Sequence, residues 1–354
     1  MSAVRESFES VAVSTRMRLA RNFADYPFPG RLLKDAHAEE QAQEIVRLIA
    51  EALAQLDQFT LYEMNGLSAE KTALLLERNL ISRDLVRNRR ISAALISSDE
   101  IISVMLNEED HVREQYFMHG FDLSRAYERI TGLDDAISES IPFAFDEQLG
   151  YLTACPTNLG TGMRASVMLF LPALSRRGVM TRTVVPELLR LGLTARGAYG
   201  EGSGAEGDLF QISNEVTLGV SEEEILTIVG KAVDSVVQME LLERARMKAE
   251  GGLVLRDKLC RAYGVLTNCR LLEEHEFLRR LADVRLGIAL GYFSGEEDEE
   301  GDDGWMTELD DLAVAMRPAN INRLNGALLD AQAQNAYRAE YVRTAIGAMR
   351  LNIE

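Results

Sequence analysis

The amino-acid sequence predicts an α+β fold in which helices flank an antiparallel β-sheet, followed by a helical C-terminal domain. Two apolar runs, residues 91–96 and 101–106, surround a polar turn at residues 97–100, which is the pattern of a β-hairpin. Further strands are predicted at residues 163–171, 179–185 and 209–212. Because antiparallel-looking strands occur together with separate helices, this class is favoured over a doubly wound sheet.

Helical patterns are equally clear. Residues 36–59 carry an apolar stripe with helical spacing, and Ser221 with the three glutamates after it forms a capping box that opens a helix to about Lys248. The glycine break at residues 250–252 predicts a domain boundary. We therefore expect a first domain over residues 1–250 and a mainly helical one over residues 251–354, with helices at 254–290 and 318–352.

Composition limits the function classes. The 354 residues are 47% hydrophobic and 27% charged, as in a globular protein with a buried core. The formal net charge of −18 opposes nucleic-acid binding, which favours a basic surface. The chain has no run of about 18 apolar residues, and residues 1–10 lack the apolar core of a secretion signal, so we expect no membrane span and no export. The acidic run at residues 296–303 is typical of a solvated loop and is assigned no function.

The three cysteines, Cys155, Cys260 and Cys269, form no CxxC pair. This spacing argues against a zinc site and against a disulfide framework. We therefore predict no metal held by protein ligands and a location in the reducing cytoplasm.

The common phosphate-binding signatures are missing from the sequence. It contains neither a GxxxxGK[ST] loop nor the catalytic-loop and DFG motifs of ordinary protein kinases. A GxGxxG string occurs at residues 202–207, but the residues after it have the pattern of a strand. Since a dinucleotide-binding loop opens a helix, this string is not interpreted as one.

Four other segments combine arginine, acid and glycine: residues 14–18, 107–113, 155–164 and 196–202. Each alone is explained by surface charges in turns. Together they suit one chemistry, because planar guanidinium groups bind phosphate oxygens and carboxylates bind a cationic guanidinium acceptor. A guanidinium nitrogen becomes a nucleophile only when a base removes a proton, and phosphoryl transfer otherwise needs positioning and charge neutralisation.

These segments contain the strings STRxR, NEEDHxR, CPTNLGTGxR and RGxxGE, and in this order they resemble the phosphagen kinases (the arginine and creatine kinase superfamily) over residues 11–248. The resemblance implies an ATP-dependent enzyme with that family's catalytic domain. Glu109 and Glu201 would hold and deprotonate the guanidinium, Cys155 would orient it, and Mg²⁺ would be bound through phosphates and water. The arginines that would bind the ATP phosphates and the transferring phosphoryl group are Arg16, Arg18, Arg113, Arg164 and Arg196.

Within that superfamily the chain resembles the bacterial protein-arginine kinases (McsB type). The first motif begins at Ser14, so we expect no helical N-terminal domain of the kind that encloses small guanidines, and an open site suits an arginine presented by a protein. Tyr199 and Met168 replace an arginine and a histidine of the arginine kinases. Residues 266–270 and 283–287 match the C-terminal domain of this branch.

One motif departs from the branch. Its C-terminal domain carries an RDxxRA motif that senses phosphoarginine, and this chain has QNAYRA at residues 334–339. Arg338 is retained and is a candidate phosphoarginine sensor. Because the leading arginine is replaced by Gln334, we expect weaker phosphate binding than in the branch.

The resemblance also implies partners. They are protein substrates with accessible arginines, a zinc-finger activator protein, a second copy of the chain bound through the C-terminal domain, and a Clp unfoldase–protease that degrades marked proteins in the stress response. Two alternatives remain open at this point: a kinase for a free guanidino compound, and a catalytically silent adaptor that binds phosphoarginine.

Overall fold

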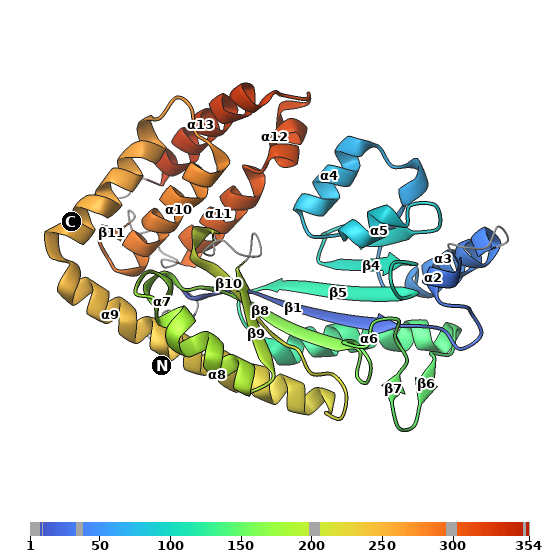
Figure 1. Ribbon diagram of the computed structural model, residues 1–354. Coiled ribbons are helices and arrows are strands. Elements are labelled where there is room, and N and C mark those ends of the chain that lie inside the picture. Colours follow the sequence, from blue (N-terminus) through green and yellow to red (C-terminus); the bar gives the residue numbers. More distant parts are fainter. Residues whose placement is uncertain are drawn as a thin grey trace.

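The computed structural model describes residues 8, 10–32, 38–197, 206–294, 303–349 and 352–353. Its centre is an antiparallel eight-stranded sheet with helices on both faces and a helical C-terminal region, which confirms the predicted α+β class (Figure 1). In spatial order the strands are β2 (Phe59–Glu63), β3 (Ala93–Ser97), β4 (Ile102–Leu106), β5 (Val112–His119), β1 (Ala12–Arg21), β8 (Met163–Phe170), β10 (Leu209–Asn214) and β9 (Leu193–Gly197). Two-residue strands form two small hairpins: β6 (Phe145–Asp146) with β7 (Gly150–Tyr151), and β11 (Phe293–Ser294) with β12 (Asn352–Ile353).

The helices account for most of the rest of the described chain. They are α2 (Pro29–Leu32), α3 (Ala38–Leu53), α4 (Ala69–Glu77), α5 (Arg83–Arg87), α6 (Leu123–Ser140), α7 (Pro172–Arg176), α8 (Val185–Arg190), α9 (Glu222–Asn268), α10 (Glu274–Ala289), α11 (Asp303–Ala315), α12 (Pro318–Asn325) and α13 (Ala331–Ala348). None of the helices in the described ranges is long and apolar enough to cross a membrane.

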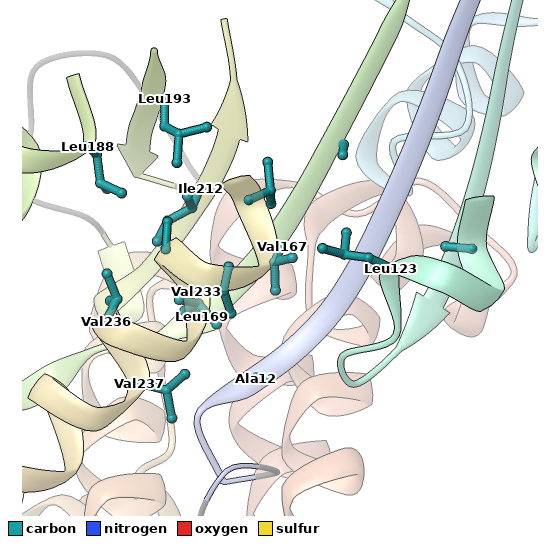
Figure 2. Packing of buried hydrophobic residues seen from close by; sticks show 14 of the residues in the cluster. Ala12, Leu123, Val167, Leu169, Leu188, Leu193, Ile212, Val233, Val236 and Val237 are labelled. Atoms are coloured by element: carbon teal, nitrogen blue, oxygen red, sulfur yellow. The ribbon is translucent and has the colours of Figure 1, made fainter. Parts of the chain in front are cut away.

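One face of the sheet is covered by α6 and α9. Figure 2 shows Val233, Val236 and Val237 of α9 packed beside Leu169 of β8 and Ile212 of β10 in one buried cluster. Strand side chains alternate between faces, so the residues between these apolar positions point to the opposite face. That opposite face carries the arginines, and α4 and α5 cover it only beside β3 and β4.

Helix α9 consists of two helical segments that meet at the predicted glycine break. Ser221 and Glu224 form the expected capping box at the start of the first segment, and the second segment runs to Asn268. The glycine break is a kink inside it, because Gly252 alone departs from helical geometry (φ 46°, ψ −139°). Beyond the kink, α9 packs with α10, α11 and α13 around a second apolar cluster. The division of the chain into two domains at this point stays a prediction.

The strand predicted at residues 179–185 is wrong. Residues Met180–Val184 form a π-helical turn that continues into α8. The run is rich in valine and threonine and therefore has the local composition of a strand. Met180, Val184 and Leu188 are nevertheless four residues apart and all buried in the first cluster, so packing on one helical face overrides that preference.

The C-terminal helices contact α4 through one carboxylate. Glu77 accepts hydrogen bonds from the backbone N–H groups of Ala319 (2.8 Å) and Asn320 (3.1 Å) in the first turn of α12. Arg317 donates to the backbone carbonyl of Glu77 (2.7 Å). An acid at a helix N-terminus is favourable, so this contact joins the C-terminal helices to the first part of the chain.

Candidate active site

Four predicted arginines lie on the three central strands. Arg16 and Arg18 are two residues apart in β1 and share one face of the sheet. Arg18 is the register partner of Arg164 in β8 and of Gln115 in β5, whereas Arg113 lies opposite Ala20. The sheet thus brings three motifs that are far apart in sequence onto one surface.

The charges of these arginines oppose one another. Burial, and then the charges of Arg16, Arg113 and Arg164, lower the pKa of Arg18 well below its usual value. Burial and Arg113 likewise lower the pKa of Arg16 to about 9. Arginine side chains remain protonated in proteins, so this lowering reports a costly gathering of positive charge that a bound anion would relieve.

Arg196 in β9 extends the cluster. Burial, followed by the charge of Arg196, lowers the pKa of Arg164. Within the described chain, the acids against this group are Glu108, 2.9 Å from Arg113, and Glu215, 3.8 Å from Arg196. Five arginines against two carboxylates leave a net positive surface.

Two guanidinium nitrogens are left without partners. The Nε atoms of Arg16 and Arg18 are buried and make no hydrogen bond to any described residue. Arg16 is nevertheless held in place, because it donates to the side-chain oxygen of Gln115 and lies 4.8 Å from the ring centroid of Phe117. Buried donors are rarely left unsatisfied, and a triphosphate would supply acceptor oxygens here. These residues therefore fit ATP.

The loop between β4 and β5 carries five polar residues with different surroundings. The Asp110 carboxylate accepts hydrogen bonds from Asn22 Nδ2 and from the backbone N–H of Ala154, each 2.6 Å long. Glu108 is buried and pairs with Arg113. Only Glu109 is exposed. The loop is thus anchored on both sides of Glu109 and presents that carboxylate to solvent.

His111 is a structural residue in this loop. Its Nδ1 accepts from the backbone N–H of Phe23 (3.1 Å), and its Nε2 therefore donates to the carbonyl of Pro27 (3.0 Å). Burial lowers the pKa of His111 to about 4, so the ring is neutral at physiological pH. Both nitrogens are occupied, which leaves neither available for proton transfer.

Glu109 opens onto a pocket of about 500 Å³. Although the Glu109 side chain is exposed, its partial desolvation, and then the charges of Asp110 and Glu108, raise its pKa above the usual value. A carboxylate with a raised pKa is a better base. The other residues that line the pocket are Phe28, Gly30, Asn88, Glu108, Thr153 and Ala154.

Cys155 follows the pocket residue Ala154 directly. It is half-buried, and its Sγ lies 3.1 Å from Thr157 Oγ1. The glycine-rich turn after it needs its glycines: Gly160 has φ +109°, and a side chain there would collide with the carbonyl of Thr217. A Cβ on Gly162 would lie 2.6 Å from the carbonyl oxygen of Ala20. The turn therefore packs directly against the end of β1, two residues after Arg18.

Comparison with known proteins identifies the family. A family model described as ATP:guanido phosphotransferase, C-terminal catalytic domain, matches residues 41–242, and one described as protein-arginine kinase McsB C-terminal domain matches residues 252–353. The chain belongs to the ATP:guanido phosphotransferase family, in its protein-arginine kinase branch.

Relatives and solved structures agree with this assignment. The protein-arginine kinase of Caldanaerobacter subterraneus subsp. tengcongensis is 38% identical over 343 residues, covering 96% of this chain and 97% of its own. The protein-arginine kinase of Geobacillus stearothermophilus is 39% identical over 338 residues, which cover 94% of this chain and 89% of that protein. A lombricine kinase structure matches with a TM-score of 0.58 and 27% identity over 67% of this chain and 68% of its own. The structure of the substrate-free duplicated taurocyamine kinase of Schistosoma mansoni matches with a TM-score of 0.59 and 26% identity. The match covers 77% of this chain and 40% of that one.

Most of the residues expected from the family motifs are found in one region. Arg16, Arg18, Arg113, Arg164 and Arg196 share one electrostatic cluster, and Glu109 lines the pocket beside the Cys155 loop. Glu201, like Tyr199, lies outside the described residues. In the described part of the chain, no three His, Cys, Asp or Glu side chains gather as a metal site.

The sequence did not reveal Arg21 as part of this architecture. Its fully buried guanidinium is paired with Asp134 (2.8 Å), donates to the carbonyl of Thr161 (2.9 Å) and lies 3.6 Å from the ring centroid of Tyr151. It fastens the glycine-rich turn to α6. The available signal was its place in the same arginine-rich strand, five residues after Arg16.

Arg338 lies far from solvent in the C-terminal helices. Its guanidinium donates to the carbonyl of Met316 (2.9 Å), the carbonyl of Leu272 (2.8 Å) and Asn335 Oδ1 (2.9 Å). These bonds join α13 to the end of α11 and to the start of α10. Its role as a phosphoarginine sensor stays a prediction.

Proposed function

We propose that this chain transfers the γ-phosphoryl group of ATP to the guanidinium group of arginine side chains in other proteins. The observation that carries the proposal is the adjacency of two features. A cluster of five arginines with unsatisfied buried donors lies on the sheet, and a pocket with an exposed carboxylate opens at the end of the same strands. The relatives named protein-arginine kinase support the choice of acceptor.

In this mechanism the arginines bind the triphosphate and stabilise the charge that spreads over the transferring phosphoryl group. Mg²⁺, held through phosphate oxygens and water, would neutralise part of that charge when bound. Arg16, Arg113 and Arg164 surround Arg18, whose position next to Arg164 and Gln115 is set by strand register.

Glu109 acts as the general base. The acceptor guanidinium loses one proton to the Glu109 carboxylate as its nitrogen attacks the γ-phosphorus. The new N–P bond forms while the bond from this phosphorus to the β,γ-bridging oxygen breaks, and ADP leaves. Glu201 would hold the other guanidinium nitrogens, and Cys155 would orient the acceptor from the opposite wall.

Asp110 and the Cys155 loop make this arrangement rigid. Because Asp110 binds the Ala154 N–H, the base and the loop that orients the acceptor cannot separate without breaking this hydrogen bond to a buried carboxylate. Positioning of this kind contributes a large part of the rate of phosphoryl transfer.

The wider biology is also a proposal. We propose that the chain acts in the cytoplasm in stress-related protein quality control, where a Clp unfoldase–protease degrades marked proteins and a zinc-finger protein activates the kinase. The three free cysteines fit a reducing compartment. We also propose that two copies of the chain associate through the C-terminal helices. Light scattering should then give the mass of a dimer, and a monomer at working concentration would contradict this proposal.

The experiment that tests the acceptor compares free arginine with an unfolded arginine-bearing protein at equal arginine concentration, in the presence of ATP and Mg²⁺. The proposal predicts phosphoarginine on the protein and little on the free amino acid. Preferential phosphorylation of free arginine would identify a kinase for a small guanidine. Nucleotide binding with no phosphorylated product would favour a silent adaptor.

A further inference from the structure

A second cavity of about 480 Å³ lies at the edge of the sheet, and none of the five clustered arginines of the active site lines it. One wall is α3, which presents an apolar strip with charged borders, and the other is the edge strand β2. The lining residues from α3 are Glu39, Gln43, Val46, Arg47, Ala50 and Glu51, and those from β2 are Leu61 and Glu63. Such a groove, apolar along its floor and charged at its rim, suits a polypeptide better than a small apolar ligand.

β2 is at the end of the strand order, so among the described residues it pairs with β3 alone. The hydrogen bonds Met64 N–H to Ser92 O (3.0 Å) and Ser98 N–H to Gln58 O (3.1 Å) fix the pairing. In an antiparallel ladder every second residue bonds to the neighbour. The even-numbered residues of β2 therefore face β3, and the backbone N–H and C=O groups of Phe59, Leu61 and Glu63 face outward.

The side chains of two of these outward residues point towards the groove. Leu61 and Glu63 line it, and Leu61 is 42% exposed. An exposed edge with free backbone groups is a template for another strand. A chain that paired with β2 would place every second side chain beside Val46 and Ala50 of α3.

One short segment of the chain contributes to the walls of both the groove and the acceptor pocket. Asn88 lines the pocket that contains Glu109, and its side chain donates to the carbonyl of Glu108 (2.7 Å). The next residue, Arg89, lines the edge groove and donates to the carbonyl of Met64 (3.2 Å) at the end of β2. A polypeptide whose arginine enters the pocket therefore has the groove beside it.

We propose that the groove between α3 and β2 binds the polypeptide that flanks the acceptor arginine, as an extended strand paired with the outer edge of β2. This rests on the proposed function and names how its protein substrates are held. Backbone pairing reads no sequence, so it suits a kinase that acts on many unfolded segments. The mixed charges at the rim, including the ion pairs Arg90–Glu39 (3.0 Å) and Arg47–Glu51 (2.9 Å), impose no single sign on the flanking residues.

The test compares two acceptors, N-acetyl-arginine methylamide and an unstructured peptide with several residues on each side of one arginine. The peptide should have a KM about tenfold lower, the effect of a few net hydrogen bonds. Leu61→Pro removes an outward N–H and leaves the pairing with β3 intact, because proline is tolerated on the open side of an edge strand. This variant should raise the KM of the peptide to that of the capped arginine, with the KM for ATP and the turnover of the capped arginine unchanged.

Leu61→Val is the matched control, since it keeps the N–H and the strand preference, and it should retain the low KM. A peptide methylated at alternate backbone nitrogens should show the same rise in KM with the unaltered protein as the plain peptide shows with Leu61→Pro. This second measurement tests the groove even if Leu61→Pro does not fold. Equal KM values for both acceptors, or a peptide KM unmoved by Leu61→Pro, would overturn the groove proposal.

The proposed function fails separately, if no arginine acceptor is phosphorylated. In that case, fluorescence anisotropy of a labelled peptide still tests the groove, by comparing the affinity of the peptide for the unaltered protein with its affinity for Leu61→Pro. Weaker binding to the proline variant supports it, and equal binding overturns it.

Discussion

The carboxylate of Asp110 accepts a 2.6 Å hydrogen bond from the backbone N–H of Ala154, across 44 residues of sequence. This bond joins the loop that carries Glu109 to the loop that carries Cys155. Burial raises the pKa of Asp110, and the hydrogen bonds from Ala154 and Asn22 oppose that rise. The two walls of the acceptor pocket therefore depend on one buried side chain.

Replacing Asp110 by alanine should reduce kcat for the acceptor about 10- to 100-fold, because a misplaced base loses alignment with the acceptor nitrogen. The N–H of Ala154 and the amide of Asn22 would also lose an acceptor, at about 1–3 kcal/mol of unfolding free energy. Steady-state kinetics and denaturant unfolding measure the two effects. A variant of full activity and stability would show that the loops hold their places without this bond.

Glu109→Gln should lower kcat by about 10²–10⁴-fold, the usual contribution of a general base, with the Kd for ATP close to that of the unaltered protein. The side chain is exposed and faces the acceptor pocket, so its loss leaves the arginine cluster intact. Asp84→Asn, at a carboxylate exposed on α5 and paired with Arg87, is the matched control and should have little effect. Calorimetric titration with ATP and single-turnover assays separate binding from transfer.

The pH profile should show the same base. Burial and the neighbouring acids raise the pKa of Glu109, and only the ionised carboxylate accepts a proton. Activity should therefore fall as the pH drops through a pKa above the ordinary glutamate value of about 4.3. Because the rise in pKa comes partly from Asp110, Asp110→Asn should move this acid limb to lower pH. An acid limb at the ordinary carboxyl pKa in both proteins would refute the assignment.

Arg18→Leu should have opposite effects on the two forms of the protein. Without nucleotide it removes a buried charge surrounded by Arg16, Arg113 and Arg164, so the melting temperature should rise. With ATP the variant should lose most of the stabilisation that the nucleotide gives, and the Kd should rise about 10²-fold for one charge-assisted phosphate contact. Thermal melts across an ATP titration measure both. A variant destabilised without ATP would indicate that Arg18 has a structural role.

Arg338→Ala should cost about 3 kcal/mol of unfolding free energy, because it leaves the carbonyls of Met316 and Leu272 without a buried donor and creates a cavity. Arg343→Ala, which removes one hydrogen bond to the carbonyl of Cys269, should cost about 1 kcal/mol. Urea unfolding in the absence of phosphoarginine checks both values. Equal and small losses would indicate that Arg338 is available to bind a ligand.

The sequence was informative where local patterns determine structure. The hairpin of β3 and β4, the capping box at Ser221 and the two-residue spacing of Arg16 and Arg18 were all predictable, because each depends on neighbours in the chain. The helical turn at Met180–Val184 was not, since packing in the core outweighs its β-branched composition.

The site required contacts between distant residues. Arg21 and Thr161 are 140 residues apart, and nothing in the local sequence shows that Arg21 holds the turn after Cys155. The tautomer of His111 likewise depends on backbone groups of Phe23 and Pro27. The motifs identified which residue types gather, whereas the division between chemical and structural roles became visible only with the fold.

Transfer of phosphate to protein arginine, with Glu109 as the base, is tested by mass spectrometry of an unfolded, arginine-bearing protein. The protein is incubated with ATP, Mg²⁺ and either the unaltered chain or Glu109→Gln, and the conditions preserve acid-labile phosphate. Phosphoarginine should form with the unaltered chain and be almost absent with the variant. Phosphate on serine, threonine or tyrosine instead, or equal phosphoarginine from both proteins, would contradict it.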